Sequence, residues 1–335
     1  MKTLLATGSL LLAVASVAAA QTAPAIVWSA PTPGLGANDV AAVAWSPTDD
    51  GLAVGSSDRW FRLRVASTGE LLYSILEPKN SGGPGNIIFS DDGQLIGVRN
   101  QSSGLGIRVQ RMTDGLFLGS IVGTVGANGL VSFAPDSMLV ATIGPSLAMW
   151  DFSELTLHQV TGSGYQKVFT DFDLSPDGRL QAASSKGFIT VRRTSDGKVL
   201  KVLRGKSPVK FSHDSSLLSA VNTTPVNEVV IWKTGTWSIL HQLVAPSAEE
   251  SSGNLRFTPD DQRLVATGYS PYLDGQGLWQ QNGFIRFWSV ATGAELVTYD
   301  AQTDLAVTSP VAFSPDGSQY AYGLYDGTVA VATTP

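Results

Sequence analysis

The sequence predicts an all-β fold built from seven repeats of four short antiparallel strands, and three observations support this prediction. A five-residue turn motif recurs along the 335 residues at intervals near 45 residues. Runs in which apolar and polar residues alternate follow each copy, as is typical of β-strands. The composition, with 35 glycines and only 15% charged residues, favours strands and turns over long surface helices.

The recurring motif is aromatic-Ser-Pro-Asp-Gly, and its clearest copy is Phe313-Ser314-Pro315-Asp316-Gly317. Proline presets the turn, aspartate bonds the following amides, and glycine accepts a positive φ. The seven copies begin at Trp45, Phe89, Phe133, Leu174, Phe211, Phe257 and Phe313. They are separated by 44, 44, 41, 37, 46 and 56 residues. These intervals are the size of one propeller blade, so the chain is predicted to form a seven-bladed β-propeller.

Each repeat has the same internal order of strands. After the motif comes a second strand such as Leu264 to Thr267, and then a third such as Ile285 to Trp288. A turn such as Asp196-Gly197 leads into a fourth strand, for example Lys198 to Leu203. Four antiparallel strands per repeat make one blade of a propeller.

The chain resembles the WD-repeat family of β-propellers, in a divergent, bacterial exported form. The resemblance rests on the Ser-Pro-Asp-Gly turn and on tryptophan near the end of the third strand, at Trp150-Asp151, Trp232 and Trp288. It covers essentially all of the mature sequence and implies the propeller fold. No Gly-His dipeptide occurs, so the hydrogen-bonded tetrad of well-formed members is not carried over.

The position of this tryptophan is occupied by other residues in three repeats, namely Arg64, Gln110 and Arg192. An arginine can fill the space with its aliphatic stem while its guanidinium bonds carbonyl groups. The alternative is an arginine that faces solvent.

The first twenty residues have the pattern of a signal peptide. Lys2 precedes an apolar stretch from Leu4 to Val17, and Ala18-Ala19-Ala20 offers a cleavage site before Gln21. We therefore expect a signal peptide at 1–20 and one propeller domain at 21–335. We expect the protein to be exported, to the periplasm, the cell envelope or the extracellular space. The alternative, a membrane-anchoring helix, needs a longer apolar core.

The seventh repeat contains only three strands before the chain ends at Pro335. An open ring would leave unpaired strand edges. A lone strand at Ala25 to Ser29 follows the leader, so we predict that it pairs with Thr328 to Ala332 and closes the ring. The residues expected at this closure are Ile26, Trp28, Val329 and Val331.

Composition and spacing argue against several chemistries. The chain has no cysteine, which excludes disulfides and thiolate chemistry, and its pI near 5.1 argues against nucleic acid as a partner. The three histidines are far apart in the sequence, and the acidic pair Asp260-Asp261 lies in the repeated turn, where aspartate bonds the backbone. We therefore expect no metal, no cofactor and no catalytic residue, and after removal of the leader we expect no membrane-spanning segment.

The longest interval contains an unusually long connection between a second and a third strand, residues 268–283. Such loops are often functional, and this one combines aromatic residues with amides, a composition favoured at binding hot spots. The candidate binding residues are Tyr269, Tyr272, Leu273, Asp274, Trp279, Gln280 and Gln281. In blade topology this connection shares a face with the long links between blades, so that face is the candidate recognition surface. The alternative is that the aromatic residues fold back over the channel.

These observations favour an exported, non-catalytic binding or scaffolding propeller that recognises a protein or an envelope polymer through its long-loop face. One alternative is an enzyme, a hydrolase, lactonase or quinoprotein-like oxidoreductase, with its site in the central channel. Another is a structural subunit of an envelope assembly.

Overall fold

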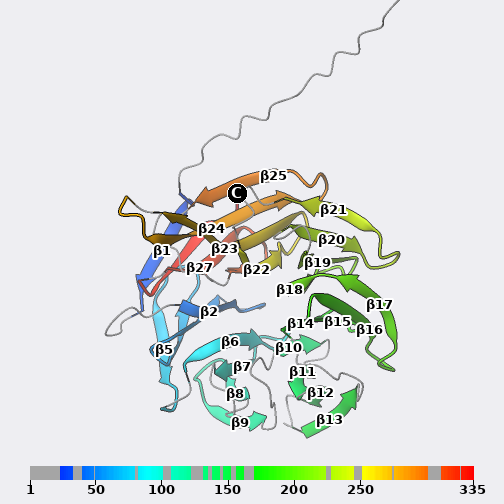
Figure 1. The fold of residues 1–335 in the computed structure, drawn as a ribbon. Coiled ribbons are helices and arrows are strands. Elements are labelled where there is room, and N and C mark those ends of the chain that lie inside the picture. The colour runs from blue at the N-terminus through cyan, green and yellow to red at the C-terminus, as the bar shows by residue number, and fades with distance from the viewer. Residues whose placement is uncertain are drawn as a thin grey trace, which may run out of the picture.

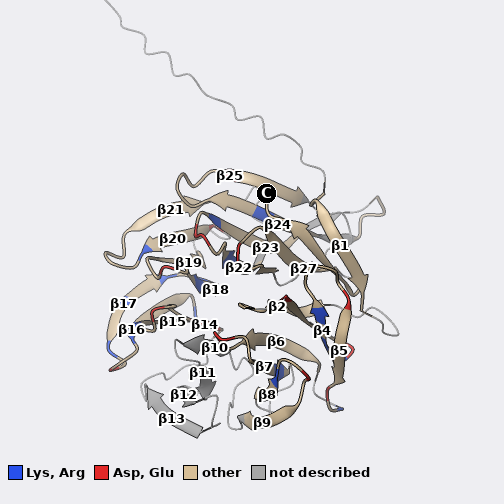
Figure 2. Cartoon of the chain, turned by 180° about the vertical axis from the view of Figure 1, so that it is seen from behind, with Lys and Arg blue, Asp and Glu red and all other residues tan. Residues whose placement is uncertain are grey.

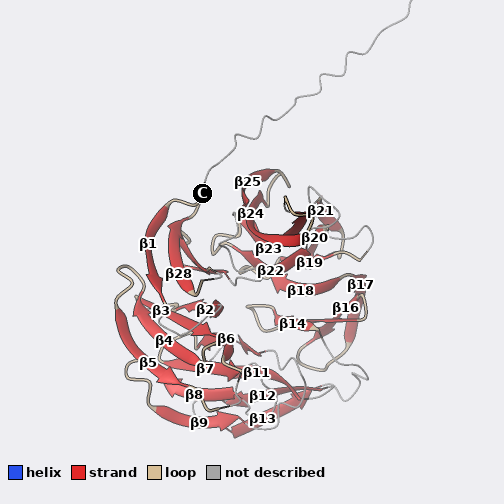
Figure 3. Ribbon diagram, turned by 60° about the vertical axis from the view of Figure 1, so that its left-hand side comes forward, coloured by secondary structure: helices blue, strands red, loops and turns tan. Residues whose placement is uncertain are grey.

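The computed structural model describes residues 23–32, 40–48, 50–79, 82–100, 107–121, 131–134, 138–143, 146–151, 156–161, 170–223, 228–244, 251–273, 275–300, 311–324 and 326–335. Within these ranges the regular structure is all β-strand (Figure 3). The strands form four-stranded antiparallel sheets, six with described side chains and a seventh, β10–β13, described by its backbone alone. The expected all-β propeller of four-stranded antiparallel blades is therefore confirmed. The expected signal peptide, 1–20, lies outside the described residues.

Blades are numbered here in chain order, and each contains strands that follow one another in sequence, apart from the last. Blade 1 consists of β2 (Val40–Trp45), β3 (Gly51–Ser56), β4 (Trp60–Val65) and β5 (Leu71–Leu76). Blade 2 consists of β6 (Pro84–Phe89), β7 (Leu95–Asn100), β8 (Ile107–Arg111) and β9 (Phe117–Ile121), and blade 3 of β10 (Val131–Ala134), β11 (Met138–Ile143), β12 (Ser146–Asp151) and β13 (Thr156–Thr161). Blade 4 consists of β14 (Asp171–Leu174), β15 (Leu180–Ser185), β16 (Phe188–Arg193) and β17 (Val199–Arg204).

Blade 5 consists of β18 (Lys206–Phe211), β19 (Leu217–Val221), β20 (Val229–Lys233) and β21 (Ile239–Leu243), and blade 6 of β22 (Ser251–Phe257), β23 (Arg263–Leu273), β24 (Trp279–Ser289) and β25 (Glu295–Asp300). Blade 7 combines the two ends of the chain, with β26 (Val311–Phe313), β27 (Gln319–Gly323), β28 (Thr328–Thr333) and β1 (Ile26–Pro31) in that order across the sheet.

The sheets are arranged around a common centre (Figure 1). The first strand of each blade lies innermost, and the first strands of successive blades contact one another. The fourth strands lie at the rim. The turns of the repeated motif, at the carboxyl ends of the first strands, therefore gather around one mouth of the centre.

Blade 7 brings the two ends of the chain together. β1 pairs antiparallel with β28, and the register places Ile26 opposite Ala332, Trp28 opposite Val331 and Ala30 opposite Val329. β1 thus lies beside β28, although the two strands are at opposite ends of the described sequence.

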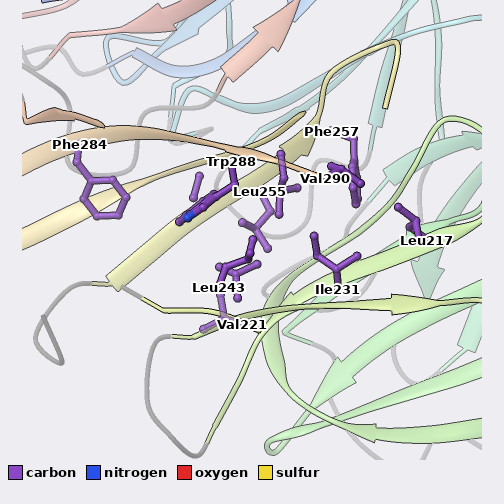
Figure 4. Close-up of a cluster of buried hydrophobic side chains, with 12 residues drawn as sticks. Leu217, Val221, Ile231, Leu243, Leu255, Phe257, Phe284, Trp288 and Val290 are labelled. Carbon is purple, nitrogen blue, oxygen red and sulfur yellow. The ribbon is translucent and has the colours of Figure 1, made fainter. Parts of the chain in front are cut away.

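The hydrophobic core is divided among the contacts between blades. Between blades 5 and 6, for example, Ile231 and Val221 pack with Leu255, Phe284 and Trp288 (Figure 4). Comparable clusters join blades 4 and 5, 6 and 7, 7 and 1, and 1 and 2. Because each of these sheets buries its faces against neighbouring sheets, few positions can hold a charged side chain. Figure 2 shows that the charged residues are scattered over the described chain.

The third strands of blades 1 to 6 share a β-bulge, and the residue at each bulge is the one that aligns with tryptophan. Arg64 is only 6% exposed. Its guanidinium donates to the carbonyl oxygens of Gly69, at 2.7 Å, and Pro31, at 3.1 Å. Arg192 is half-buried and donates to Gly197 O at 2.8 Å, and Gln110 is fully buried. The interpretation that arginine fills the tryptophan position is confirmed for both arginines.

The repeated motif is held by its own side chains. In blade 7, Ser314 Oγ donates to Asp316 Oδ1 at 2.6 Å, and the amides of Ser318 and Gln319 donate to Asp316 Oδ1 and Ser314 Oγ, each at 3.0 Å. The hydrogen bond from Ser314 keeps the pKa of Asp316 below its ordinary value. The acidic residues at this position are thus explained by turn geometry.

In blades 7, 1 and 5, an aromatic side chain on the fourth strand donates a hydrogen bond to a backbone carbonyl of the next blade. Trp28 Nε1 lies 2.6 Å from Ala66 O, Tyr73 Oη 2.9 Å from Met112 O, and His241 Nε2 2.9 Å from Val290 O. Each ring packs on a glycine with positive φ in that next blade: Gly69, Gly115 and Gly293. The imidazole of His241 therefore serves the contact between blades 5 and 6.

Candidate functional site

The long connection of blade 6 is mostly paired strand. The expectation of a 16-residue loop was wrong, because β23 and β24 each continue for 11 residues and pair from Arg263–Ser289 out to Leu273–Trp279. The aromatic residues of this segment favour extended backbone. The turn is confined to the tip, where Gly277 has a φ of 76°. The segment is therefore a β-hairpin continuous with its blade.

Six of the seven candidate binding residues lie on the paired part of this hairpin. Tyr269 is half-buried on β23, opposite Gly283. Further out, Tyr272 lies opposite Gln280 and Leu273 opposite Trp279. Gln281 lies opposite Pro271. Asp274 lies outside the described residues.

The outer part of the hairpin extends past both neighbouring strands. The pairing of β23 with β22 ends at Tyr269, and the pairing of β24 with β25 ends at Phe284. Within the described residues, the backbone edges at 270–273 and 279–283 thus have no adjoining strand. The tip, residues 275–278, is exposed, and Leu278 retains 58% of its surface.

A hollow on the same side of the ring, at the equivalent connection of blade 1, is lined by charged and small residues. Its volume is about 510 Å³, and its lining includes Asp58, Arg59 and Lys79. Asp58 is fixed by an ion pair of 2.8 Å with the guanidinium of Arg62, whose side chain is 4% exposed. Its pKa is lowered although burial opposes this, because hydrogen bonds from Arg62 and Ser56 stabilise the carboxylate.

A larger cavity lies at the opposite mouth, among the turns of the repeated motif, and the sequence interpretation did not locate it. Its volume is about 660 Å³. It is lined by the carboxyl ends of the first strands of blades 1, 4, 5, 6 and 7, with further residues from blade 2. The residue just before the motif's aromatic position lines it in five blades: Ala44, Asp173, Lys210, Arg256 and Ala312.

The charged wall of this cavity comes from blades 4, 5 and 6. Lys210 Nζ lies 3.0 Å from Asp173 Oδ1, and Asp173 Oδ2 accepts the amide of Phe211 at 2.8 Å. Arg256 is exposed, and no ion pair of its side chain is found within the described residues. The Asp173–Lys210 pair is thus neutralised internally, and Arg256 adds one positive charge.

Deeper in the same strands, the carboxylate of Asp171 joins blade 4 to blade 5. It is 8% exposed and accepts the amides of Phe172 and Val209, each at 2.8 Å. Burial raises the pKa of Asp171. The two backbone bonds assign it a structural role between β14 and β18.

The apolar wall of the cavity comes from blades 7 and 1. Trp45 and Phe313, at the aromatic position of the motif, are half-buried there, and Pro47 and Pro315 extend this surface to the turns. His213 lies at the rim, where its Nδ1 is 3.0 Å from Asp261 Oδ1. Asp261 also accepts the amides of His213 and Asp214, so the pair ties adjacent turns.

The described residues offer no further chemical centre. No group of three or more His, Asp or Glu side chains that could hold a metal ion occurs among them. No helix long and apolar enough to cross a membrane occurs in the same ranges. His158 lies on β13, where its side chain is outside the description.

Comparison with solved structures establishes the fold. The chain is similar to a chain of the structure titled "Crystal Structure of Mitotic Checkpoint Complex", with a TM-score of 0.72 and 16% sequence identity, over 100% of this chain and 99% of the other. The fold is a β-propeller of four-stranded antiparallel blades. As 1433 chains of solved structures match, this fold does not single out one function. No protein-family model matches the sequence, and neither does any curated protein.

Proposed function

We propose that this chain is a non-catalytic binding propeller that recognises a protein partner through the face bearing the β23–β24 hairpin. The observation that carries the proposal is the pairing of this hairpin out to Leu273–Trp279, beyond the ends of β22 and β25. A paired hairpin presents its residues at low entropic cost, because their backbone is already ordered before binding.

The hairpin's backbone edges at 270–273 and 279–283, which have no adjoining strand among the described residues, indicate how a partner would bind. Edges with unpaired amide and carbonyl groups accept an extended segment of another chain as an added strand. The fold supports the proposal as well, since a ring of sheets forms a rigid base for loops and hairpins.

We further propose that the seven sheets form one closed ring and that the protein acts after export. The pairing of β1 with β28 and the contacts between successive first strands support closure. The signal-peptide pattern of residues 1–20 supports export. The export proposal is tested by mass spectrometry of the amino-terminal peptide of protein purified from its native source. We expect the mature chain to start at Gln21.

The binding proposal is tested by shortening the hairpin. Residues 269–282 are replaced by the two-residue Lys186-Gly187 turn, which joins β15 to β16 in blade 4. Tagged wild-type and shortened proteins are used for affinity isolation from the native cell fraction, and each captured protein is then titrated in purified form. We expect a partner that binds the wild type at least about tenfold more tightly than the shortened form.

The matched control is Leu278→Ser, which changes one exposed residue at the tip and keeps the paired hairpin. It is expected to bind the partner as the wild type does. Far-ultraviolet circular dichroism and thermal unfolding verify that the shortened protein is folded. Equal binding of a purified partner by a folded shortened protein and by the wild type would overturn the assignment of the hairpin. Failure to find any partner of the wild type would overturn the proposed function.

An enzymatic function in the central channel is not favoured by the described residues. The carboxylates and the lysine that line the cavity or lie close behind it are engaged with each other or with backbone amides, as Asp171, Asp173 and Lys210 show. The cavity is better suited to holding a ligand than to transferring protons.

A further inference from the structure

We propose that the cavity at the turn-bearing mouth is a binding site for a carboxylate attached to an apolar body. The site lies on the face opposite the β23–β24 hairpin, and the proposal is independent of the function assigned to that hairpin. Three properties of the lining carry it: volume, division into two walls, and the placement of one cation.

The volume of about 660 Å³ lies within the range that holds a small ligand or a few residues of a peptide. Sites of this kind are mostly apolar and contain a few polar groups that fix the orientation of the ligand. The cavity divides these properties between two walls: alanine, proline and aromatic side chains contribute most of the wall on blades 7 and 1, and charged side chains line blades 4, 5 and 6.

The apolar wall is continuous across two blades. Ala312 and Ala44 occupy the same repeat position in blades 7 and 1, next to Phe313 and Trp45. The small alanine side chains leave room where blades 4, 5 and 6 place an aspartate, a lysine and an arginine. An apolar or aromatic group would gain contact area along this wall, and Phe313 is held in place from behind by Phe287 and Tyr320.

The polar side of the site selects a negative charge. Lys210 is occupied by Asp173, and His213 by Asp261. Arg256 adds a cation, and its planar guanidinium matches a carboxylate in a two-point hydrogen bond. Asp91, from the turn of blade 2, lines the far side of the apolar wall, so a bound carboxylate is directed to blade 6.

Two sources of this chemistry are distinguished by the choice of probe: the carboxyl terminus of a peptide and a free small carboxylic acid. The probes are N-acetyl-Leu-Phe as free acid and as amide, and 3-phenylpropionate with its amide. Binding to the full mature protein is measured by isothermal titration calorimetry, with tryptophan fluorescence as a second readout because Trp45 lines the cavity.

We expect at least one free acid to bind about tenfold or more tightly than its amide, which is the range of a charge-assisted hydrogen bond. Arg256→Gln is expected to remove this preference and leave amide binding unchanged. The matched control is Arg204→Gln, which removes the same charge from an exposed arginine on the outer strand β17. It is expected to leave both affinities unchanged.

Preference for the dipeptide acid identifies a peptide terminus as the ligand class, and preference for 3-phenylpropionate identifies a free acid. The proposal is overturned if neither acid binds, if acid and amide bind equally, or if Arg256→Gln and Arg204→Gln have the same effect. The hairpin-shortened protein is expected to bind the acid as the wild type does. The two proposals are therefore tested separately: loss of acid binding concerns the cavity, and loss of partner binding concerns the hairpin.

Discussion

Replacement of Trp28 by alanine tests the contact between the amino-terminal strand and blade 1. The Trp28 indole donates to Ala66 O at 2.6 Å and packs on Gly69, where an added Cβ would lie 2.7 Å from a ring carbon. A fully buried tryptophan loses about 3–5 kcal/mol of stability on truncation to alanine. As Trp28 is half-buried, roughly half of that applies, and the carbonyl that loses its donor adds about 1 kcal/mol.

We therefore expect Trp28→Ala to lower the free energy of unfolding by about 3 kcal/mol, a large part of the stability of a typical domain. Trp28→Phe keeps much of the ring and loses the N–H, so its expected cost is about 1 kcal/mol. Urea unfolding followed by far-ultraviolet circular dichroism measures both values.

The control is Val27→Ala on the same strand, because Val27 is 44% exposed and the expected change is within about 0.5 kcal/mol. Equal stability of Trp28→Ala and Val27→Ala would refute the reasoning, since it would mean that the indole contributes nothing to the contact between blades 7 and 1.

Three further changes follow from contacts described above. Arg64→Met keeps the apolar stem but leaves two carbonyl oxygens without their donor. We expect the free energy of unfolding, measured in urea, to fall by about 1–3 kcal/mol. An unchanged value would show that these hydrogen bonds do not contribute to stability. Gly293→Ala places a Cβ 2.7 Å from Nδ1 of His241 at a φ of 71°, and a fall in melting temperature of several degrees is expected; an unchanged melting temperature would contradict the packing. Burial raises the pKa of Tyr322 to about 12, so on raising the pH the phenol ionises in the unfolded state before it does in the folded state. The contribution of Tyr322 to stability is therefore fully present below pH 10 and declines as the pH rises towards 12. Urea unfolding of Tyr322→Phe across this range is expected to show a weaker decline with pH than the wild type, and identical slopes would refute the assignment.

The repeat pattern was sufficient to predict the blade architecture, because the turn motif uses residue types that its geometry requires. The hydroxyl of Ser314, the carboxylate of Asp316 and the glycine at 317 each have a specific part in the turn. The same reasoning covers the tryptophan position, where the bulge and its backbone carbonyls accept an arginine in place of an indole.

The hairpin was only partly predicted from the sequence. Its length was evident from the spacing of the motifs, but a 16-residue connection was interpreted as a loop. The glycines at 275 and 277 lie at the tip, and Pro271 lies within the paired strand β23. Pairing with a partner strand thus outweighed local turn propensity, as it commonly does in β-sheets.

The cavity could not be predicted by reading repeats one at a time. One repeat position contributes to its lining in each of five blades, and only the arrangement of the blades around a common centre brings Arg256, Ala312 and Ala44 to the same cavity. Aligning the residue before the motif's aromatic position across the repeats would have revealed the contrast between charged and alanine-bearing blades.

The partnership of β1 with β28 makes folding depend on both ends of the chain. Ile26 and Ala332 are about 300 residues apart, and closing a loop of that length costs about 5 kcal/mol of chain entropy. At ordinary rates of synthesis, β1 waits about 15–60 s for its partner strand to emerge.

During that interval the backbone edge of β1 that later pairs with β28 has no partner and is available to other chains. A chain that is truncated before β28 retains its first strand without a partner. Pairing of β1 within blade 7 therefore requires that β28 has been synthesised.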